Sequence, residues 1–422
     1  MSTPARIPPL PHTHLAHTIA RAVRDAGGRA WMVGGSVRDA LLGRASKDVD
    51  LEVHGLTAEE LLPVLSAVAP VQAVGRSFGV YKVGPGYDPI DVALPRAGEA
   101  AQNTHRGGVQ GDPHMGLEAA CQGRDLTINA IVADPLTGEV ADPTGGCTDL
   151  AQRALRAVDP TRFGEDPLRV IRVARFAATH DLTPTPDLLA LCRSIDTHDV
   201  ATERISGEVV RALLRSAAPG RFLSVLTDVR AWDTTWPGLE ATEAQLQRVD
   251  RAAALRSHAG PPPRDLALML GAVLLDAPER AGVILDHLRI HKRAGFDVGN
   301  TVVRAIQAAP TLRGSASPDT ALRRAAEVVD VAVAATLTES AWPEVDGTQL
   351  RHRASSLGVL HAPLAPLVYG RDLLDAGIPR GRILGELLHE IREHQLQGAV
   401  SSPEAAVSLA QRLWTSRRPS RV

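Results

Sequence analysis

The stretch "SKDVDLEV" (residues 46–53) places Asp48, Asp50 and Glu52 at alternate positions, with an apolar residue between each pair. Because successive side chains of a β-strand point to opposite faces, this pattern predicts a strand with one acidic face and one apolar face. A half-exposed strand with a solvated polar face would explain the pattern. Two carboxylates that hold a divalent metal ion would explain it equally well, so the neighbouring segments must decide.

The segment "VGGSVRD" (33–39), just before the acidic strand, is predicted to join a strand to a helix. Its two glycines would let the backbone approach a ligand closely, and the first N–H groups of the helix would face a phosphate. Arg38 could add charge-assisted hydrogen bonds to the same phosphate. A plain tight turn with Ser36 as the N-cap is the alternative, since the pattern matches neither the dinucleotide fingerprint nor the Walker pattern.

Carboxylates on neighbouring strands would complete a metal site beside that turn. Mg²⁺ favours oxygen ligands and binds through one or two carboxylates together with substrate phosphates. Asp48 and Asp50 fit this description, and Asp91 in "PIDVAL" (89–94) is a candidate third carboxylate. Metal ions held there would activate an attacking hydroxyl and stabilise a leaving pyrophosphate. Glu52 is expected to be solvated or to support the site from behind.

A third segment, "GEDPLRVIRVARF" (164–176), carries Asp166, Arg169, Arg172 and Arg175 at intervals of three residues. This spacing predicts that the four side chains follow one side of a helix. The pattern alone favours a salt-bridged surface helix. The alternative is a carboxylate and a guanidinium that read the edge of a nucleobase, with the remaining arginines binding phosphate.

The order of predicted elements indicates an α+β protein. Strands are expected at 29–33, 79–84 and 89–94, mixed with helices, and a long loop at 96–116. Helical periodicity dominates after residue 149. We therefore expect a mixed-sheet head at 1–145, a helical neck at 146–235, and a helical body and tail at 236–422. A chain of 422 residues is long enough for such a division.

Composition excludes several classes of protein. The formal charge of −2 indicates that any nucleic-acid contact depends on local basic faces. The three cysteines have no metal-ligand spacing and are expected to be reduced thiols. We find neither a signal-peptide core nor an apolar run near the ~20 residues of a membrane span, so a cytoplasmic protein without a membrane contact is expected. Oligomeric state is left open.

Four segments in order resemble the class II nucleotidyltransferases, the family of the bacterial CCA-adding tRNA nucleotidyltransferase and poly(A) polymerase. They are "VGGSVRDALLGRASKDVDLEV" (33–53), "GRDLTINAIVADPLTGEVADPTGG" (123–146), "EDPLRVIRVARF" (165–176) and "GRDLLDAGIPRGRILGELLHEIREHQLQG" (370–398). The resemblance implies that the head is a nucleotidyltransferase-type catalytic domain and that the neck carries a nucleobase-selecting helix. It also implies that the body and tail bind tRNA.

The resemblance implies roles for individual residues. Asp48 and Asp50 would be the catalytic residues that hold Mg²⁺ ions. Asp166 and Arg169 would read the Watson–Crick edge of CTP or ATP. The full set of residues expected to bind the nucleotide is Gly35, Arg38, Arg124, Asp166, Arg169, Arg172 and Arg175.

The activity implied is addition of CMP and AMP from CTP and ATP to the 3′ end of tRNA, with release of pyrophosphate. Enzymes that add only CC or only A share these motifs, as does poly(A) polymerase, against which the near-neutral charge argues mildly. A non-catalytic RNA-binding protein on the same scaffold is an alternative of a different class. Asp48, Asp50 and Arg38 argue against it, since a pure binder gains nothing from an acidic pair beside RNA phosphates.

Two segments depart from the family pattern. Gly123 precedes Arg124 where two arginines are usual, and Leu126 stands where Phe is frequent. These changes could alter handling of the tRNA end or the order of addition. The segment "LGAVLLDAP" (270–278) has Leu275-Asp276 where many relatives have a His-Asp pair, so no second, phosphohydrolase activity is expected.

Overall fold

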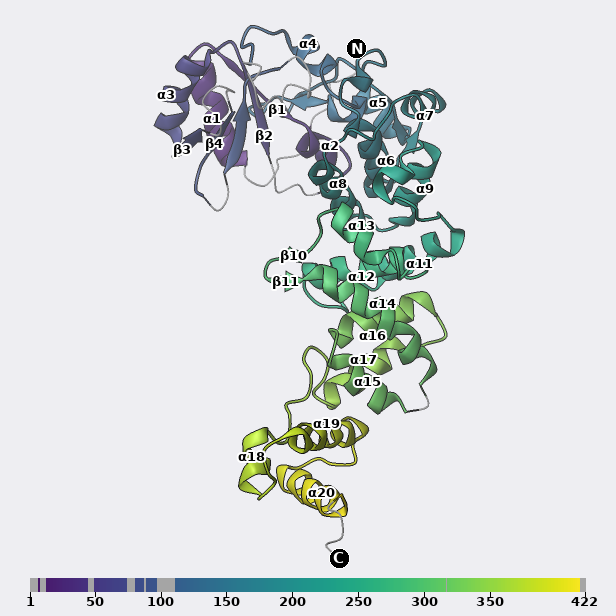
Figure 1. The fold of residues 1–422 in the computed structure, drawn as a ribbon. Coiled ribbons are helices and arrows are strands. Elements are labelled where there is room, and N and C mark those ends of the chain that lie inside the picture. Colours follow the sequence, from purple (N-terminus) through teal and green to yellow (C-terminus); the bar gives the residue numbers. More distant parts are fainter. Residues whose placement is uncertain are drawn as a thin grey trace, which may run out of the picture. The chain divides into compact units, whose positions relative to one another are not determined.

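The computed structural model describes residue 7 and residues 13–44, 49–73, 80–86, 89–96, 111–315 and 317–417 (Figure 1). The chain divides into two compact units, Met1–Val200 with Val225–Ala231, and Ala201–Ser224 with Trp232–Val422. The first unit mixes strands and helices and the second is almost entirely helical. The predicted α+β class is therefore confirmed. The predicted boundaries after residues 145 and 235 stay predictions.

The first unit is built on a mixed sheet of strand order β3-β4-β5-β2-β1-β6-β7. β2 runs parallel to β5, and the other pairs are antiparallel. Its strands are β1 (Arg29–Val33), β2 (Asp50–His54), β3 (Val71–Ala73), β4 (Val80–Val83), β5 (Ile90–Ala93), β6 (Val132–Ala133) and β7 (Val140–Ala141).

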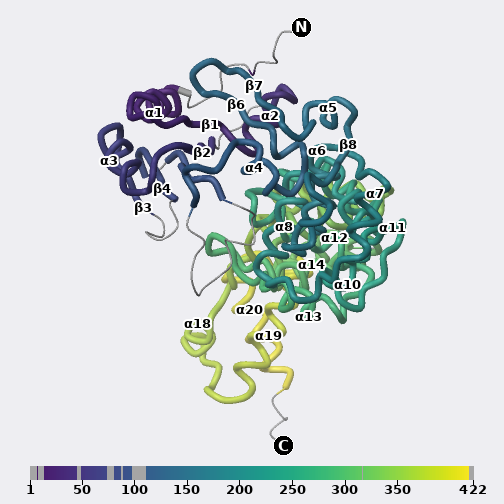
Figure 2. Tube along the Cα trace, turned by 90° about the horizontal axis from the view of Figure 1, so that it is seen from above, coloured from purple at the N-terminus to yellow at the C-terminus, as the bar shows by residue number. Residues whose placement is uncertain are grey.

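Alternate side chains of β1 point to opposite faces of the sheet, and each face is covered by a helix. Trp31 and Val33 pack with Cys121 of α4 (Leu117–Gln122) on one face. The alternate residues of β1 are also buried, on the opposite face, and α1 (Thr13–Asp25) contacts this strand. α3 (Ala58–Val68) lies beside α1, as Figures 1 and 2 show, and begins at a capping box formed by Thr57 and Glu60. Both faces of the sheet at β1 are thus buried.

The predicted strands agree with these bounds to within two residues, except at the acidic strand. β2 begins at Asp50, because Val49 is described but is not part of the strand; residues 45–48 lie outside the described part of the chain. The predicted loop at 96–116 also falls largely outside it, at residues 97–110. After that gap, the N–H of Asp112 donates to the carbonyl oxygen of Pro95 at 2.9 Å, which ties the returning chain to the end of β5.

The rest of the first unit carries the predicted nucleobase-selecting segment. The helix α6 (Leu168–His180) buries Val170, Ile171, Val173, Ala174 and Ala177 in the core. The remaining elements are α2 (Gly35–Leu41), the 3₁₀ turns η2 (Thr127–Asn129) and η3 (Phe163–Glu165), α5 (Gly146–Ala151), β8 (Ala154–Leu155), α6 (Leu168–His180), β9 (Thr183–Pro184) and α7 (Pro186–Arg193).

The second unit consists of helices packed around α12 (Pro262–Leu274), in which every residue from Leu266 to Leu274 is buried. A short hairpin, β10 (Lys292–Arg293) and β11 (Phe296–Asp297), interrupts the helices. The helices are α8 (Thr202–Arg215), α10 (Trp232–Thr235), α11 (Glu243–Ala254), α12 (Pro262–Leu274), α13 (Ala281–His287), α14 (Val298–Gly314), α15 (Pro318–Ala326), α16 (Val331–Ala341) and α17 (Gly347–Ser356), followed by α18 (Gly370–Asp375), α19 (Arg382–Gln397) and α20 (Pro403–Ser416). α9 (Gly220–Asp228) crosses from this unit into the first.

The last three helices have a hydrophobic cluster of their own, centred on the fully buried Leu373, Leu387, Ala406 and Ala410. In the described part of the chain, no helix is both long and apolar enough to span a membrane. The three cysteines are free thiols.

Candidate functional site

The register of the sheet places two carboxylates side by side. Asp50 of β2 pairs with Asp91 of the parallel strand β5, and neighbouring strands lie about 4.8 Å apart. Lys82 of β4 is opposite Asp91, with its Nζ 2.8 Å from Oδ1. Carboxylate oxygens on one face of a sheet are the ligands that a divalent cation such as Mg²⁺ prefers. Asp48 lies outside the described residues, and the described ones contain no group of three or more His, Cys, Asp or Glu arranged to hold a metal.

The glycine turn faces one of these carboxylates. Gly34 has φ 73° and ψ −138°, a conformation that side-chain-bearing residues rarely adopt. A Cβ added at Gly34 would lie 3.9 Å from Oδ2 of Asp50, so the acid and the turn are neighbours. Ser36 is not the N-cap that the simple-turn interpretation required, because its hydroxyl donates to the carbonyl oxygen of Val33 and Gly34 occupies the N-cap position.

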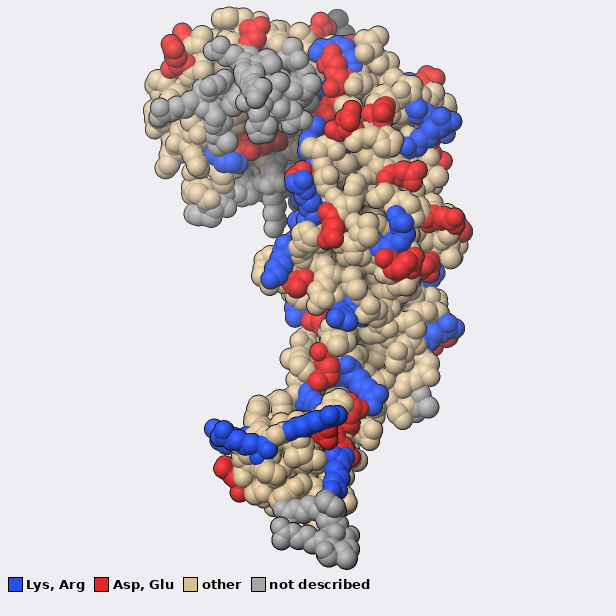
Figure 3. All heavy atoms as spheres, viewed as in Figure 1, with Lys and Arg blue, Asp and Glu red and all other residues tan. Residues whose placement is uncertain are grey.

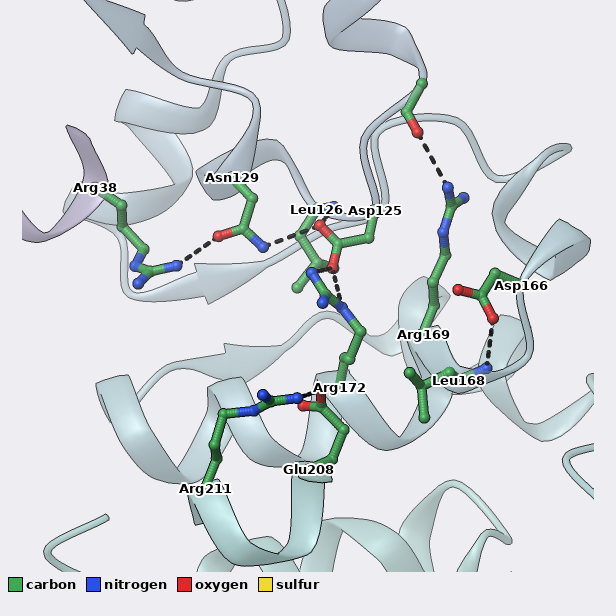
Figure 4. Close-up of polar contacts among 11 residues, drawn as sticks. Arg38, Asp125, Leu126, Asn129, Asp166, Leu168, Arg169, Arg172, Glu208 and Arg211 are labelled. Atoms are coloured by element: carbon green, nitrogen blue, oxygen red, sulfur yellow. Dashed lines mark hydrogen bonds and ion pairs between the residues drawn. The ribbon is translucent and has the colours of Figure 1, made fainter. Parts of the chain in front are cut away.

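A chain of hydrogen bonds joins the turn to α6 (Figure 4). Nη1 of Arg38 donates to Oδ1 of Asn129 at 2.6 Å, and Nδ2 of Asn129 donates to Oδ1 of Asp125 at 2.9 Å. The other carboxylate oxygen of Asp125 accepts from Nε of Arg172 at 2.8 Å. The N–H of Leu126 also donates to this carboxylate. Arg38 and Arg172 are thus oriented by two linked acceptors, Asn129 at the end of η2 and Asp125 just before η2.

Asp125 carries its charge in a fully buried position, with 1% of its surface exposed. Burial alone would raise its pKa, but the charge of Arg172 and the hydrogen bonds from Asn129, Arg172 and Leu126 outweigh burial and lower the pKa to about 2. The carboxylate is therefore ionised at any physiological pH, and it keeps Arg172 fixed by an ion pair.

Arginines surround an aromatic ring at the centre of this arrangement. The guanidinium carbons of Arg38, Arg172 and Arg175 lie 5.2, 5.4 and 3.8 Å from the ring centroid of Phe176. His180 stacks on the same ring at 5.7 Å. Burial and the neighbouring arginines lower the pKa of His180 to about 3, so it stays neutral and adds no further positive charge.

These side chains line one pocket, which we call the arginine cavity. It is lined by Gly34, Gly35, Arg38, Arg124, Asp125, Asn129, Arg172, Arg175 and Phe176. The structure therefore brings together five of the seven residues predicted to bind the nucleotide. A concave site with four arginines and a glycine turn is suited to a polyphosphate.

Arg124 connects the arginine cavity with the carboxylate face. It lines both, and its Nη2 donates to Oε2 of Glu52 at 2.7 Å. Glu52 is buried, and it also lies 3.2 Å from Nε2 of His54. Burial raises its pKa, but the contacts with His54 and Arg124 outweigh burial and lower the pKa below its ordinary value. Glu52 is not solvated; it supports Arg124 from behind, which is the second of the two roles expected.

Asp166 and Arg169, the predicted base-reading pair, are buried and are not among the residues that line the arginine cavity. Asp166 precedes α6 in an extended conformation and accepts from the N–H of Leu168, while Arg169 donates to the carbonyl oxygens of Gly123 and Arg162. The surface-helix interpretation is wrong for these two residues, since neither is at the surface. Their role in base selection stays a prediction.

Three residues of the cavity were missed by reasoning from sequence. Asp125 and Asn129 lie in the quoted segment at 123–146, and Phe176 ends the one at 165–176. The signal for Asp125 and Asn129 was the alternation of polar and apolar residues in "DLTIN" (125–129). Periodicity cannot show that such residues meet an arginine from a distant helix.

Part of the chain matches a known family. Residues 30–156 match the poly A polymerase head domain family. The chain is 40% identical over 233 residues to a multifunctional CCA protein of Stenotrophomonas maltophilia, a match that covers 53% of this chain and 54% of the relative. A protein of the same name from Xylella fastidiosa is 37% identical over 235 residues, covering 53% of each chain. The chain thus spans about half the length of the curated relatives it matches.

Solved structures match over nearly the whole length. The Bacillus stearothermophilus CCA-adding enzyme in complex with CTP has a TM-score of 0.72 at 24% identity, covering 96% of this chain and 98% of that one. The Thermotoga maritima CCA-adding enzyme complexed with tRNA has a TM-score of 0.71 at 18% identity, covering 98% and 100%. The resemblance to the class II nucleotidyltransferases is thereby confirmed. The fold is the one seen in the CCA-adding enzymes, and nucleotidyltransferases of this kind generally use a divalent metal.

Proposed function

We propose that this chain is a CCA tRNA nucleotidyltransferase, which adds CMP and AMP from CTP and ATP to the 3′ end of tRNA without a nucleic-acid template. The observation that carries the proposal is the adjacency of the arginine cavity and Asp50 across the Gly34 turn. A triphosphate held by the arginines has its reactive phosphorus beside the carboxylates, which is the arrangement that nucleotidyl transfer requires.

The reaction is an in-line displacement. The 3′-hydroxyl oxygen of the RNA forms a bond with the α-phosphorus of the nucleotide, and the bond from that phosphorus to the bridging oxygen breaks. Pyrophosphate leaves with the bridging oxygen, and the hydroxyl proton is released to solvent. Arg38, Arg172 and Arg175 bind the triphosphate and stabilise the charge that develops on pyrophosphate. Asp48 and Asp50, with Asp91 as a candidate third ligand, would hold Mg²⁺, which would neutralise phosphate charge and favour ionisation of the attacking hydroxyl.

Selection of the base is assigned to Asp166 and Arg169. An ionised Asp only accepts hydrogen bonds and Arg only donates them, so the two complement the amino group and ring acceptor of cytosine or adenine. Both side chains are buried at the start of α6, the helix that supplies Arg172 and Arg175 to the arginine cavity.

The division of labour follows the predicted domains, with catalysis in the head (1–145), base selection in the neck (146–235) and tRNA binding in the body and tail (236–422). Duplex RNA is recognised through its shape and phosphates, so the helical part needs arginines on its surface more than base contacts. With tRNA and nucleoside triphosphates as substrates, the proposed site of action is the cytoplasm.

One assay tests the proposal. Purified protein is combined with tRNA that lacks CCA, that ends in C, or that ends in CC, together with labelled CTP or ATP in all pairings. Full activity predicts CMP on the first two substrates and AMP on the third. Addition of only CC, or only A, would identify a partial enzyme. Repeated AMP addition to unrelated RNA would identify a poly(A) polymerase, and RNA binding without incorporation would identify a non-catalytic protein.

A further inference from the structure

Helix α4 is joined to strand β2 at both of its ends. At the start of the helix, Nδ1 of His54 lies 2.9 Å from the carbonyl oxygen of Met115, two residues before α4. At its end, Nη2 of Arg124 donates to Oε2 of Glu52 at 2.7 Å. Oε1 of Glu52 lies 3.2 Å from Nε2 of His54, so the two contacts are linked through the strand. We call Glu52 and His54 together the β2 clamp.

The β2 clamp is shielded from water, and its polar atoms have matching partners. The side chains of Glu52 and His54 are 9% and 12% exposed. Because the carbonyl oxygen of Met115 can only accept, Nδ1 of His54 is the donor in that contact. The backbone N–H of the next residue, Gly55, donates to the carbonyl oxygen of Pro113 at 2.7 Å and holds the same stretch of chain. Such contacts fix positions firmly, since an unpaired buried polar group is costly.

Two groups of the proposed nucleotide site depend on where the end of α4 lies. Arg124 lines the arginine cavity and follows Gly123, the C-cap residue of the helix. The carbonyl oxygen of Gly123 accepts from Nη2 of Arg169 at 3.0 Å. Arg169 therefore takes part of its orientation from α4, although it belongs to α6. A displacement of this helix end would move a phosphate-binding group and the acceptor of a base-reading group together.

We propose that the β2 clamp consists of positioning residues for nucleotide binding, which hold the end of α4 so that Arg124 meets the triphosphate and Arg169 is aimed at the base. The inference rests on the proposed function, which supplies the roles of these two arginines. Asp50, the proposed metal ligand, lies on the same strand two residues before Glu52. One strand would then set the positions of the metal, the phosphates and the base relative to one another, without a clamp residue having to touch the nucleotide.

The test compares Glu52→Ala with Glu118→Ala in the full-length protein. Glu118 is a matched control because it is exposed on α4 itself. At saturating tRNA, we expect Glu52→Ala to raise the KM for CTP and ATP roughly tenfold at a nearly unchanged kcat, since binding is lost equally in the ground state and the transition state. The Kd for CTP, measured without RNA, should rise by the same factor. Partial unfolding would instead lower kcat at an unchanged KM, because the molecules that stay folded bind normally.

Further variants separate positioning from a general loss of structure. Glu52→Gln keeps an acceptor for Arg124, and its amide N–H can donate to Nε2 of His54, so the KM should stay within about threefold of the wild-type value. His54→Phe keeps a ring but removes both contacts, and should raise the KM for both nucleotides roughly threefold. In a double-mutant cycle, Glu52→Ala should lose most of its effect on CTP affinity once Arg124→Gln is present, because that effect passes through Arg124.

Three outcomes would overturn the assignment: an unchanged nucleotide KM in both Glu52→Ala and His54→Phe, a fall in kcat alone, or additive effects in the cycle. Each of them would leave the proposed function intact. A wild-type protein that binds CTP but incorporates no nucleotide would overturn the proposed function instead, and the cycle in CTP affinity would still decide whether the β2 clamp positions Arg124.

Discussion

Asp125 accepts hydrogen bonds from Asn129, Arg172 and the backbone of Leu126 while it is shielded from water. Because its pKa is lowered to about 2 in the folded protein, its ionised form stabilises the fold above the ordinary Asp pKa of about 4. That stabilisation is lost as the pH falls towards 2. We expect the difference in unfolding free energy between wild type and Asp125→Asn to shrink by about 2 kcal/mol over this window.

Urea titrations at a series of pH values measure this difference. Asp25→Asn is the control, because Asp25 is largely exposed at the end of α1. A difference that is independent of pH would show that the carboxylate of Asp125 is not an ion-pair partner of Arg172 in the folded state.

Asp50 is predicted to act on the transition state. Asp50→Ala should lower kcat by roughly a thousandfold or more and leave tRNA affinity nearly unchanged, since a metal ligand stabilises developing charge and does not hold the tRNA. The same is expected of Asp48→Ala. Single-turnover incorporation and filter binding of tRNA separate the two effects. Near-normal turnover in both variants would contradict the metal assignment.

Asp166 and Arg169 should set the choice of nucleotide. Loss of a group that pairs with the base edge costs about 1–3 kcal/mol for the matching base, or roughly ten- to a hundredfold in selectivity. Asp166→Ala should therefore relax discrimination against UTP and GTP, and Arg169→Ala should reduce use of CTP more than of ATP. Competition among all four triphosphates measures these ratios. Wild-type ratios in both variants would show that the buried pair serves packing alone.

For single residues, the sequence predicted the contacts that depend only on positions close together in the chain. The adjacency of the Gly34 turn to the carboxylate of Asp50 could be inferred because a short connection joins the turn to the acidic strand. The hydrogen bond from Arg124 to Glu52 could not be inferred from the sequence, since it depends on which face of β2 is buried. The three-residue spacing of Asp166, Arg169 and Arg172 was also misleading, because α6 begins only at Leu168 and the side chains diverge.

Among the elements, α5 and the turn η2 are packed without room between them. A Cβ at Gly146 would lie 2.2 Å from the carbonyl oxygen of Thr127, so Gly146→Ala must displace η2, which carries Asn129. We expect a loss of about 1–3 kcal/mol in unfolding free energy and weaker CTP binding. Gly116→Ala is the control, since φ is −64° and a Cβ there meets no heavy atom within 4 Å.

Thermal unfolding and CTP titration of the two variants check this prediction. Equal stability of both alanine variants would show that η2 adapts at no cost.

The strand and helix bounds themselves were largely predictable, because periods of 2 and 3.6 are local signals. The parallel pairing of β2 with β5 was not, because it joins residues on either side of an intervening helix and two strands.

In the molecule as a whole, tRNA affinity should depend on the last three helices. Figure 3 shows basic side chains on the surface of this part, and Arg371 and Arg382 are 82% and 94% exposed. We expect the double variant Arg371→Gln/Arg382→Gln to raise the KM for tRNA several-fold and leave the KM for CTP unchanged, since phosphate contacts are lost without disturbing the core.

Removal of residues from 370 onward should have the same effect, only larger. Circular dichroism of both variants confirms that the remaining helices fold. An unchanged tRNA affinity in the truncated protein would assign tRNA binding to the rest of the chain.

The parallel pairing of Asp50 with Asp91 also bears on how freely the chain can change in length. The distance between the two carboxylates is set by hydrogen bonds between β2 and β5, and not by the segment that connects them. The connection between β4 and β5 passes through Pro85 and Gly86, which are exposed. Residues, or a whole reporter domain, inserted there would lengthen the connection without altering the register, so this hairpin is a natural place to attach a label to the folded protein.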